Sequence, residues 1–360
     1  MQDNLPSYVL ITPARNEAQF IEQTICSVIA QTIRPARWII VSDGSTDGTD
    51  EIVKRYLTEN QWIELVRMPE RRDRHFAAKV HSFNGGYQKV GERSYEVIGN
   101  LDADITFEND YFEFLLGKFA ENPGLGVAGT PFVEGKESYD YRYTSLEHVS
   151  GACQLFRRQC FEEIGGYRPI KSGGIDWVAV TTARMKGWKT RTFLEKVCCH
   201  HRPMGTASSG KLKAWYSLGR QDYYLGGHLL WELFRSCLQM KSKPYVLGGL
   251  CLMTGFTSAF IARTERPIDP QLVAFHQREQ MQRLRAAFLK IGERRGQEIG
   301  ASIESQRSNS WRGYHQSQSL SINQPRLAQV ILIPPVDFMF SFQLVANAYL
   351  GRSITIDRAR

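Results

Sequence analysis

Short apolar runs alternate with helical patterns over the first half of the chain. Runs typical of strands lie at residues 8–12, 38–42 and 63–66. Between them, residues 17–31 and 52–57 carry apolar side chains at the three- and four-residue spacing of an amphipathic helix. A strand, a helix and a second strand in this order pair the strands in parallel with a right-handed crossover. The pattern predicts an α/β fold with a mostly parallel central sheet flanked by helices.

The most informative apolar run is residues 97–107, VIGNLDADITF, which contains two carboxylates one residue apart. Such a run is typical of a strand that is buried on both faces. In an open α/β sheet, ligands bind outside the carboxyl ends of the strands. Asp102 and Asp104 at such an end are therefore placed to hold a divalent cation against a phosphate. An acid-rich turn without a ligand is the alternative for this segment alone.

The pattern changes in the last part of the chain. Residues 245–262 form an uncharged run whose length is at the lower edge of a membrane span of about 17 to 25 residues. A true span, a re-entrant or interfacial segment and a buried core helix remain open for it. Residues 270–289 predict a basic amphipathic helix, and residues 297–326 are rich in Ser, Gln and Asn, which favours a flexible segment.

Three regions are therefore expected. Residues 1–204 form the α/β domain, and residues 205–296 form a basic and aromatic helical region with the candidate membrane segment 245–262. Residues 297–360 form a flexible linker and a tail without an assigned role.

The charge is unevenly spread, and this indicates the kind of partner. The net charge is +8, but residues 1–200 carry 24 Lys and Arg against 27 Asp and Glu, whereas residues 201–360 carry 21 against 10. Nothing resembles a nucleic-acid recognition module. The basic excess therefore favours an anionic membrane surface or an anionic lipid-linked substrate, with a solvated basic face as the alternative.

The cysteines and the N-terminus indicate the compartment. The seven cysteines show no CxxC spacing, so neither a disulfide framework nor a zinc site is indicated, and reduced cytosolic thiols are expected. The chain enters its first strand within a few residues and shows no secretion signal. Together with the basic C-terminal half, this predicts a location on the cytoplasmic face of the cell membrane.

Three ordered motifs make the reading more specific: PARNE at residues 13–17, VSDGSTDGT at 41–49 and LDAD at 101–104. With these motifs the chain resembles the inverting glycosyltransferases of family two, which have the GT-A fold. The resemblance covers about residues 7–201. It implies transfer of a sugar from a UDP-, GDP- or dTDP-sugar to a hydroxyl group of a glycan or lipid-linked acceptor, as in polysaccharide or cell-envelope synthesis, with Mg²⁺ or Mn²⁺.

The resemblance also implies residue roles on the donor side. Asp43 would accept a hydrogen bond from the base, and a carboxylate at a strand end suits the imide N–H of uracil. Asp102 would meet the ribose, and Asp104 would face the cation together with one of the neighbours His200 and His201. The remaining donor-binding candidates are Pro13, Arg15, Glu17, Lys79, Asn84 and Arg202.

On the acceptor side, the resemblance implies that Asp176 is the general base. A helix N-cap is the alternative for an aspartate at this place. Family members commonly carry an acid before this aspartate, where this chain has Ile175. The motif Gln-x-x-Arg-Trp of processive synthases is absent, because Gln154 and Arg157 are followed by Arg158. Transfer of one sugar per encounter is therefore expected.

Two other classes of protein remain as alternatives. Residues 102–106 also fit the DxDxT pattern of haloacid-dehalogenase-like phosphatases, in which Asp102 would be a nucleophile. That motif normally lies on the first strand of its domain, and no later acid pair of that family follows. The second alternative is a membrane-bound protein that binds a sugar nucleotide without catalysis, which Ile175 keeps open.

Overall fold

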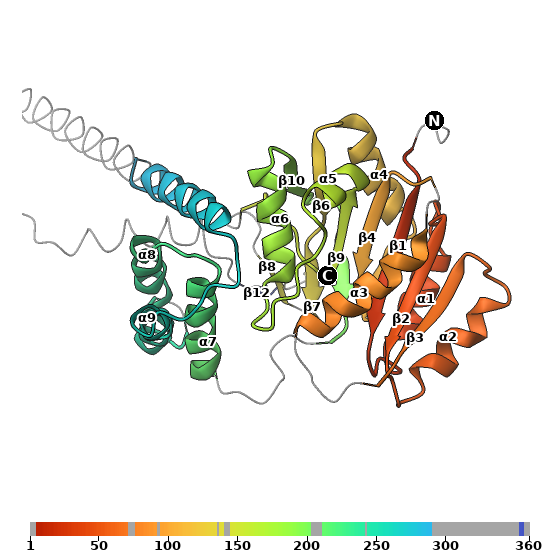
Figure 1. The fold of residues 1–360 in the computed structure, drawn as a ribbon, viewed down its shortest axis with the longest axis horizontal. Coiled ribbons are helices and arrows are strands. Elements are labelled where there is room, and N and C mark those ends of the chain that lie inside the picture. The colour runs from red at the N-terminus through yellow and green to blue at the C-terminus, as the bar shows by residue number, and fades with distance from the viewer. Residues whose placement is uncertain are drawn as a thin grey trace, which may run out of the picture.

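A seven-stranded sheet forms the centre of the N-terminal domain (Figure 1). The computed structural model describes residues 5–70, 76–91, 94–134, 137–139, 145–202, 211–241, 243–289 and 353–355. The strand order is β10-β6-β9-β4-β1-β2-β3, with β1 (Tyr8–Ala14), β2 (Arg37–Asp43), β3 (Ile63–Met68), β4 (Val97–Leu101), β6 (Leu125–Gly129), β9 (Cys153–Arg157) and β10 (Lys189–Thr192). Only β9 runs antiparallel to its neighbours, and the other pairs of this sheet are parallel. The predicted mostly parallel sheet is confirmed.

Helices cover both faces of this sheet. Alternate residues of β1 enter different cores: Tyr8 and Leu10 pack with α1 (Ile21–Ile29), α2 (Thr49–Leu57) and α4 (Tyr111–Glu121). Val9 and Ile11 pack on the other side with α3 (Phe76–Val90), α5 (Arg158–Glu163) and α6 (Ile175–Met185). Successive side chains of a strand point to opposite faces. Burial on both faces therefore explains why these strands are continuous apolar runs.

The run 97–107 is two strands and not one. β4 ends at Leu101, and β5 (Ile105–Phe107) belongs to a second sheet of order β12-β8-β7-β11-β5, with β7 (Phe132–Glu134), β8 (Glu137–Tyr139), β11 (Cys198–His200) and β12 (Ser353–Thr355). The predicted strand therefore ends before the two acids, as expected, and they lie in the turn where the chain passes from one sheet to the other. Since β11 pairs antiparallel with β5, His200 lies opposite Ile105, next to this turn.

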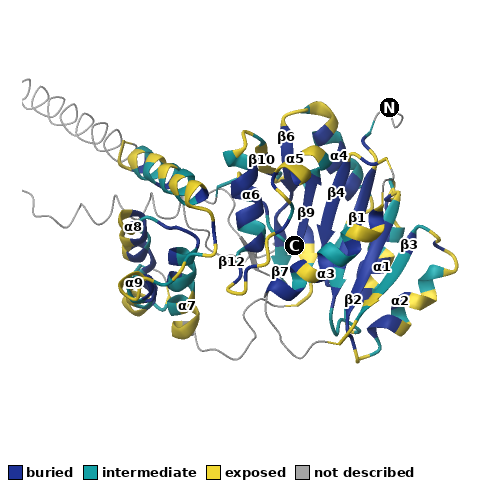
Figure 2. Cartoon of the chain, in the orientation of Figure 1, coloured by how far each residue is buried: buried dark blue, intermediate teal, exposed yellow. Residues whose placement is uncertain are grey.

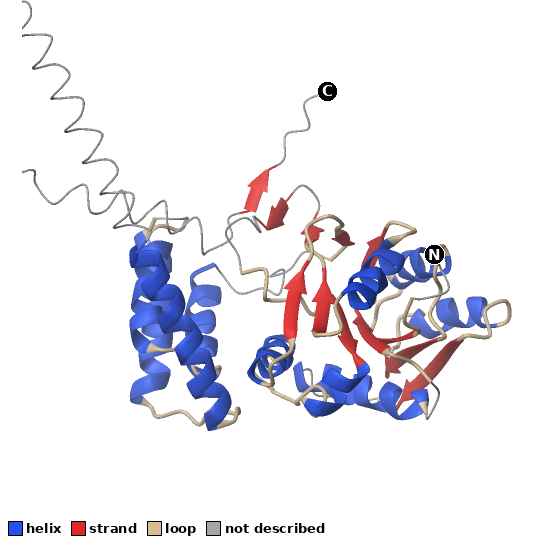
Figure 3. Cartoon of the chain, turned by 90° about the horizontal axis from the view of Figure 1, so that it is seen from above, coloured by secondary structure: helices blue, strands red, loops and turns tan. Residues whose placement is uncertain are grey.

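The helices after residue 210 form a bundle beside the sheet domain (Figure 3). It contains α7 (Lys211–Tyr224), α8 (Leu229–Gln239) and α9 (Val246–Ile261), and the predicted helix over residues 270–289 is present. A Cβ atom on Gly219 would lie 1.9 Å from the carbonyl oxygen of Leu252, so α7 and α9 are in close backbone contact. The helix 270–289 returns to the domain, where its Glu279 pairs with Arg184 of α6 at 2.8 Å.

The candidate membrane segment 245–262 is α9 with one flanking residue at each end. In the part of the chain that the structure describes, no helix is long and apolar enough to cross a membrane. The predicted flexible region 297–360 lies outside the described residues, apart from the short strand β12.

Candidate active site

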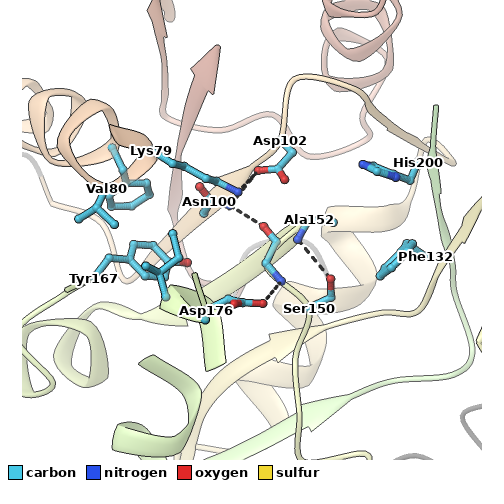
Figure 4. Close-up of a pocket in the computed structure, with 14 residues that line it drawn as sticks. Lys79, Val80, Asn100, Asp102, Phe132, Ser150, Ala152, Tyr167, Asp176 and His200 are labelled. Carbon is cyan, nitrogen blue, oxygen red and sulfur yellow. Dashed lines mark hydrogen bonds and ion pairs between the residues drawn. The ribbon is translucent and has the colours of Figure 1, made fainter. Parts of the chain in front are cut away.

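Two adjoining cavities lie at the carboxyl ends of the central strands. The larger, of about 850 Å³, is lined by Pro13, Arg15, Glu17, Asp43, Lys79, Asp102, Asp104 and Arg202 among others. The smaller, of about 230 Å³, is lined by Asp176 and His200 among others (Figure 4). Lys79 and Asp102 line both cavities. The structure therefore brings most of the sequence-predicted site residues to one edge of the sheet.

The loops after β1 and β2 are joined by hydrogen bonds. The backbone N–H groups of Asn16, Glu17 and Ala18 donate to Ser45 Oγ, Thr49 Oγ1 and Asp47 Oδ2 at 3.1, 2.8 and 2.9 Å. The short polar side chains of the SDGSTDGT loop thus bind the PARNE segment as well as the start of α2. Gly44 has a φ of 66° and passes so close to Glu70 that a Cβ atom would lie 2.6 Å from its Cα, which fixes glycine at this turn.

Asp43 is buried at the end of β2 and carries a cationic neighbour. Its Oδ2 lies 3.5 Å from Nη1 of Arg15, a half-buried side chain. The two motifs are therefore linked by charge as well as by backbone hydrogen bonds. An ion pair of this kind orients the carboxylate toward the larger cavity, which both residues line.

Asp102 is held by two donors. Lys79 of α3 donates to its Oδ1 at 2.5 Å, and Asn100 Nδ2 lies 3.4 Å from the same oxygen. Burial lowers the pKa of Lys79, but the attraction of Asp102 outweighs it and raises this pKa above its ordinary value. Lys79 therefore stays charged beside the Asp102 carboxyl group.

Asp104 faces a histidine and an arginine. Its Oδ2 lies 3.5 Å from Nε2 of His200 and 3.7 Å from Nε of Arg202. The other ring nitrogen of His200, Nδ1, lies 2.8 Å from Oε1 of Glu134, which fixes the ring orientation. Burial, together with the charge of Asp102, raises the pKa of Asp104 above its ordinary value.

Glu17 adds a further acid to the same group. Its side chain pairs with Arg202, and both residues line the larger cavity. Burial raises the pKa of Glu17 to about 7, opposed by Arg202 and supported by Asp104 and Asp102. The acids Asp102 and Asp104 therefore lie close enough to Glu17 to raise its pKa, and a bound cation would relieve this repulsion.

Asp176 lies in the first turn of α6, one residue after its start. The N-cap of this helix is Gly174, with a φ of 82°, and no side chain caps it. Asp176 Oδ2 accepts a hydrogen bond from the backbone N–H of Gly151 at 3.2 Å. The N-cap alternative is therefore wrong for Asp176, whose carboxylate contacts another segment and the smaller cavity.

Two predicted residues lie apart from these cavities. Asn84 is half-buried on α3 and lines neither of the two cavities. The ring of His201 points to Thr106, with Nε2 at 2.8 Å from Oγ1, whereas His200 is the histidine beside Asp104. The neighbouring Gly86 serves packing, because a Cβ atom there would lie 2.8 Å from methyl groups of Ile11 and Val41.

The structure also adds residues that the sequence did not indicate. Asn100 donates from Nδ2 to the carbonyl oxygen of Gly151 at 2.7 Å, so it joins Asp102 to the peptide that holds Asp176. Asn100 lies two residues before Asp102. Side chains two residues apart along a strand point to the same face of the sheet, and this spacing could have indicated that Asn100 lies beside Asp102. Glu134, Gly151, Tyr167 and Lys171 come from distant segments, and no local pattern marks them.

Comparison with protein families gives one match to this region. Residues 9–174 match the family described as Glycosyl transferase family 2. The matched range contains the loops after β1 and β2, the turn with Asp102 and Asp104, and Gly151.

Curated relatives are similar over about two fifths of the chain. The poly-beta-1,6-N-acetyl-D-glucosamine synthase of Staphylococcus aureus (strain COL) is 29% identical over 149 residues, which is 41% of this chain and 34% of the relative. The synthase of the same name from Staphylococcus epidermidis is 26% identical over 170 residues, 42% of this chain and 39% of the relative. The matched region thus spans little more than a third of these relatives.

A solved structure has a similar fold. The mannosyltransferase PcManGT from Pyrobaculum calidifontis, in complex with GDP-Man and Mn²⁺, aligns with a TM-score of 0.50 and 18% sequence identity. The alignment covers 76% of this chain and 79% of that chain. It supports the α/β GT-A architecture, in agreement with the mixed sheet and its two helical layers.

Proposed function

Because residues 9–174 form a domain of glycosyl transferase family 2, we propose that this enzyme transfers a sugar, with inversion, from a nucleoside-diphosphate sugar to an acceptor hydroxyl group. The observation that carries the proposal is that Asp102 and Asp176 line one cavity of about 230 Å³. A donor-side carboxylate and a candidate base thus face the same space. The family match leaves no support for a phosphatase with Asp102 as nucleophile.

The larger cavity is the proposed nucleotide site. Asp43 accepts a hydrogen bond from the base, and Arg15 holds the carboxylate in place. A base without the matching N–H donor cannot make this hydrogen bond, so it should bind more weakly, by about 1 to 3 kcal/mol. Arg202 and Lys171, which line the same cavity, are the cations proposed for the diphosphate.

The residues present fit a divalent cation. Asp104 Oδ2 and His200 Nε2 lie 3.5 Å apart and offer a carboxylate oxygen, which suits Mn²⁺ or Mg²⁺, and an imidazole nitrogen, while the acid Asp102 lies close to Asp104. Within the described residues there is no group of three or more His, Cys, Asp and Glu arranged as a complete metal site. Asp104 and His200 would therefore hold the ion together with oxygens of the diphosphate. When bound, the ion stabilises the negative charge of the leaving diphosphate.

Asp176 is the proposed general base. It takes the proton of the acceptor hydroxyl as that oxygen bonds to the anomeric carbon. The bond from this carbon to the diphosphate oxygen breaks on the opposite face, and the nucleoside diphosphate leaves with the bonding electron pair. The hydrogen bond from the backbone N–H of Gly151 holds the carboxyl group of Asp176 in one orientation, in the first turn of α6.

The acceptor is proposed to be a glycan or a lipid-linked saccharide, with one sugar added per encounter. In processive relatives of this family a Gln-x-x-Arg-Trp segment is expected near the acceptor. Here Gln154 is buried and bonded to Tyr167 and Val149. The guanidinium of Arg157 donates to the carbonyl oxygens of Leu125, Phe119 and Asn122. These side chains serve the fold.

The donor is tested first, by calorimetric titration with UDP-, GDP- and dTDP-sugars with and without Mn²⁺. We expect one nucleotide class to bind in a metal-dependent manner. Release of the nucleoside diphosphate in the presence of oligosaccharide or polyprenyl-linked acceptors then measures turnover, and the length of the product reports whether one sugar or many are added.

The role of Asp176 is tested with Asp176→Asn. General base catalysis contributes typically about 10² to 10⁴-fold, so we expect turnover to fall by that factor while donor binding is retained. Glu147→Gln, which changes an exposed acid elsewhere, is the matched control and should keep full turnover. Donor binding without turnover in the unaltered chain would instead indicate the non-catalytic binding protein.

A further inference from the structure

Helix α9 is apolar on every side but covered on only one. Its sequence, VLGGLCLMTGFTSAFI, contains no charged residue. A helix that is apolar all round is normally buried all round. In this bundle, however, one side of α9 is exposed along its length, and Figure 2 shows exposed surface on both α8 and α9. We therefore expect the exposed side of α9 to contact a second apolar partner.

The covered side of α9 contains glycines at its closest contacts with α7 and α8. Gly249 packs against α8, where a Cβ atom would lie 2.3 Å from the carbonyl oxygen of Ser236. Gly255 packs against α7, where a Cβ atom would lie 2.1 Å from the carbonyl oxygen of Tyr216. Because α7 and α8 already occupy this side, the exposed side cannot turn inward. It needs a partner from outside the bundle.

The exposed side of α9 carries a row of mostly apolar residues, and α8 exposes a further set. On α9, exposed residues follow one another at helical spacing: Val246, Leu247, Leu250, Thr254 and Ile261. On α8 the exposed residues are Leu229, Leu230, Leu233 and Cys237. We refer to these nine residues as the apolar stripe. Of 14 large apolar side chains exposed in the described part of the chain, 12 lie between Leu212 and Leu289 and only two, Leu194 and Val197, lie in the sheet domain.

Basic residues stand at both ends of the stripe on α9. Exposed Lys243 precedes the helix and exposed Arg263 follows it, while Glu265 is the acid that lies nearest in sequence. Residues 201–360 as a whole carry 21 Lys and Arg against 10 Asp and Glu. This arrangement of apolar residues between cations is complementary to a surface with an apolar interior and anionic groups at its boundary with water. A second copy of the stripe would instead bring like charges together.

We propose that the apolar stripe docks on an anionic lipid surface, with α9 lying in the plane of the membrane. A helix of 16 residues spans about 24 Å, which is less than the hydrocarbon core of about 30 Å, so an in-plane position agrees with its length. Apolar side chains enter the boundary between headgroups and acyl chains, and the flanking cations contact the headgroups. The proposal stands on α8 and α9 and does not depend on the sugar-transfer chemistry.

The test is flotation of the full chain with vesicles of phosphatidylcholine, alone or with about 30% phosphatidylglycerol. We expect tighter binding to the anionic vesicles and residual binding in high salt, because apolar burial is not screened. The double variant Leu247→Asp, Leu250→Asp should bind at least about tenfold more weakly. The matched control is Leu194→Asp, Val197→Asp, which changes the two exposed apolar residues of the sheet domain and should bind as the unaltered chain does.

Two further measurements separate lipid from other partners. Lys243→Glu, Arg263→Glu should reduce binding to anionic vesicles and leave binding to neutral vesicles unchanged. Light scattering on the vesicle-free protein reports association between copies. Unchanged vesicle binding in Leu247→Asp, Leu250→Asp would overturn the proposal. Absence of vesicle binding by the full chain would also overturn it. The stripe would then be assigned to contact between copies if the unaltered chain forms a dimer that Leu247→Asp, Leu250→Asp dissociates.

Discussion

The backbone N–H of Gly151 donates a hydrogen bond to Oδ2 of Asp176 at 3.2 Å, and the position of this carboxylate depends on the absence of a side chain at Gly151. A Cβ atom at residue 151 would lie 2.9 Å from Cβ and 3.2 Å from Cγ of Asp176. The candidate base is therefore set by a backbone segment that precedes β9, and this segment is in turn bound by Asn100.

Gly151→Ala should move the Asp176 carboxylate by a few tenths of an ångström or more. Because misplacement by about 1 Å costs on the order of 10²-fold in rate, we expect kcat to fall about 10- to 100-fold with little change in donor affinity. Steady-state kinetics and calorimetry measure the two quantities. Gly117→Ala on α4 is the control, since no atom lies within 4 Å of its added Cβ, and equal kcat values for the two variants would contradict the prediction.

Asn100→Ala should affect both stability and turnover. Asn100 is buried, and its loss leaves the carbonyl oxygen of Gly151 without its donor, at a cost of about 1 to 3 kcal/mol. Asp102 also loses a neighbour at 3.4 Å. We expect a lower melting temperature and a lower kcat with KM for the donor changed less. A variant with a lowered melting temperature and normal kcat would assign Asn100 a structural role only.

The layered α/β domain could be predicted because each strand and helix is marked by its own local pattern of apolar residues. β1 and β2 carry continuous apolar runs, since alternate side chains enter different cores on the two faces of the sheet. Asp43 is the last residue of β2 and Glu17 lies in the loop after β1, and strand ends in a parallel sheet meet at one edge. The gathering of most donor-side candidates at this edge was therefore predictable.

The rest of the site depends on contacts between distant segments. Glu134 meets His200 only because β7 and β11 pair in the second sheet, and short strands of two or three apolar residues leave no clear pattern. The sequence also did not indicate that residues 105–107 belong to a second sheet, because Ile105 and Phe107 continue the apolar pattern of β4. His200 and His201 were not separable in sequence, and the register of β11 with β5 decides which ring meets Asp104.

Asp104→Ala should remove the metal dependence of donor binding. Of the acids in the turn, Asp104 pairs with His200, whereas Asp102 is engaged by Lys79. We expect calorimetry with a nucleoside diphosphate to give the same weak affinity with and without Mn²⁺. Asp110→Ala, an acid whose partner is the surface residue Lys196, is the control. An unchanged response to Mn²⁺ in Asp104→Ala would exclude a metal role for this residue.

The last prediction concerns a charged group inside the C-terminal bundle. Arg235 pairs with Asp222 at 2.5 Å and with Glu232 at 3.6 Å, so one guanidinium faces two carboxylates. Glu232 is almost completely buried, and neither of its carboxylate oxygens has a hydrogen-bond partner among the described residues. Burial raises the pKa of Glu232 to about 8, with Arg235 opposing and Asp222 supporting the shift.

A folded-state pKa of about 8 against an ordinary 4.5 means that the folded protein binds this proton more tightly than the unfolded chain does. The resulting stability is complete below about pH 4.5 and is lost as the pH rises through about 8. Glu232→Gln mimics the protonated side chain, so at pH 9 it should melt at a higher temperature than the unaltered chain, by about 2 to 4 °C for each kcal/mol gained. At pH 4, where the side chain is mostly protonated in both the folded and the unfolded state, the two should melt nearly alike. Scanning calorimetry at both values measures this, with Glu121→Gln, an exposed acid on α4, as the control. If Glu232→Gln destabilised the protein at pH 9, its carboxylate would be ionised and the pairing with Arg235 would outweigh burial.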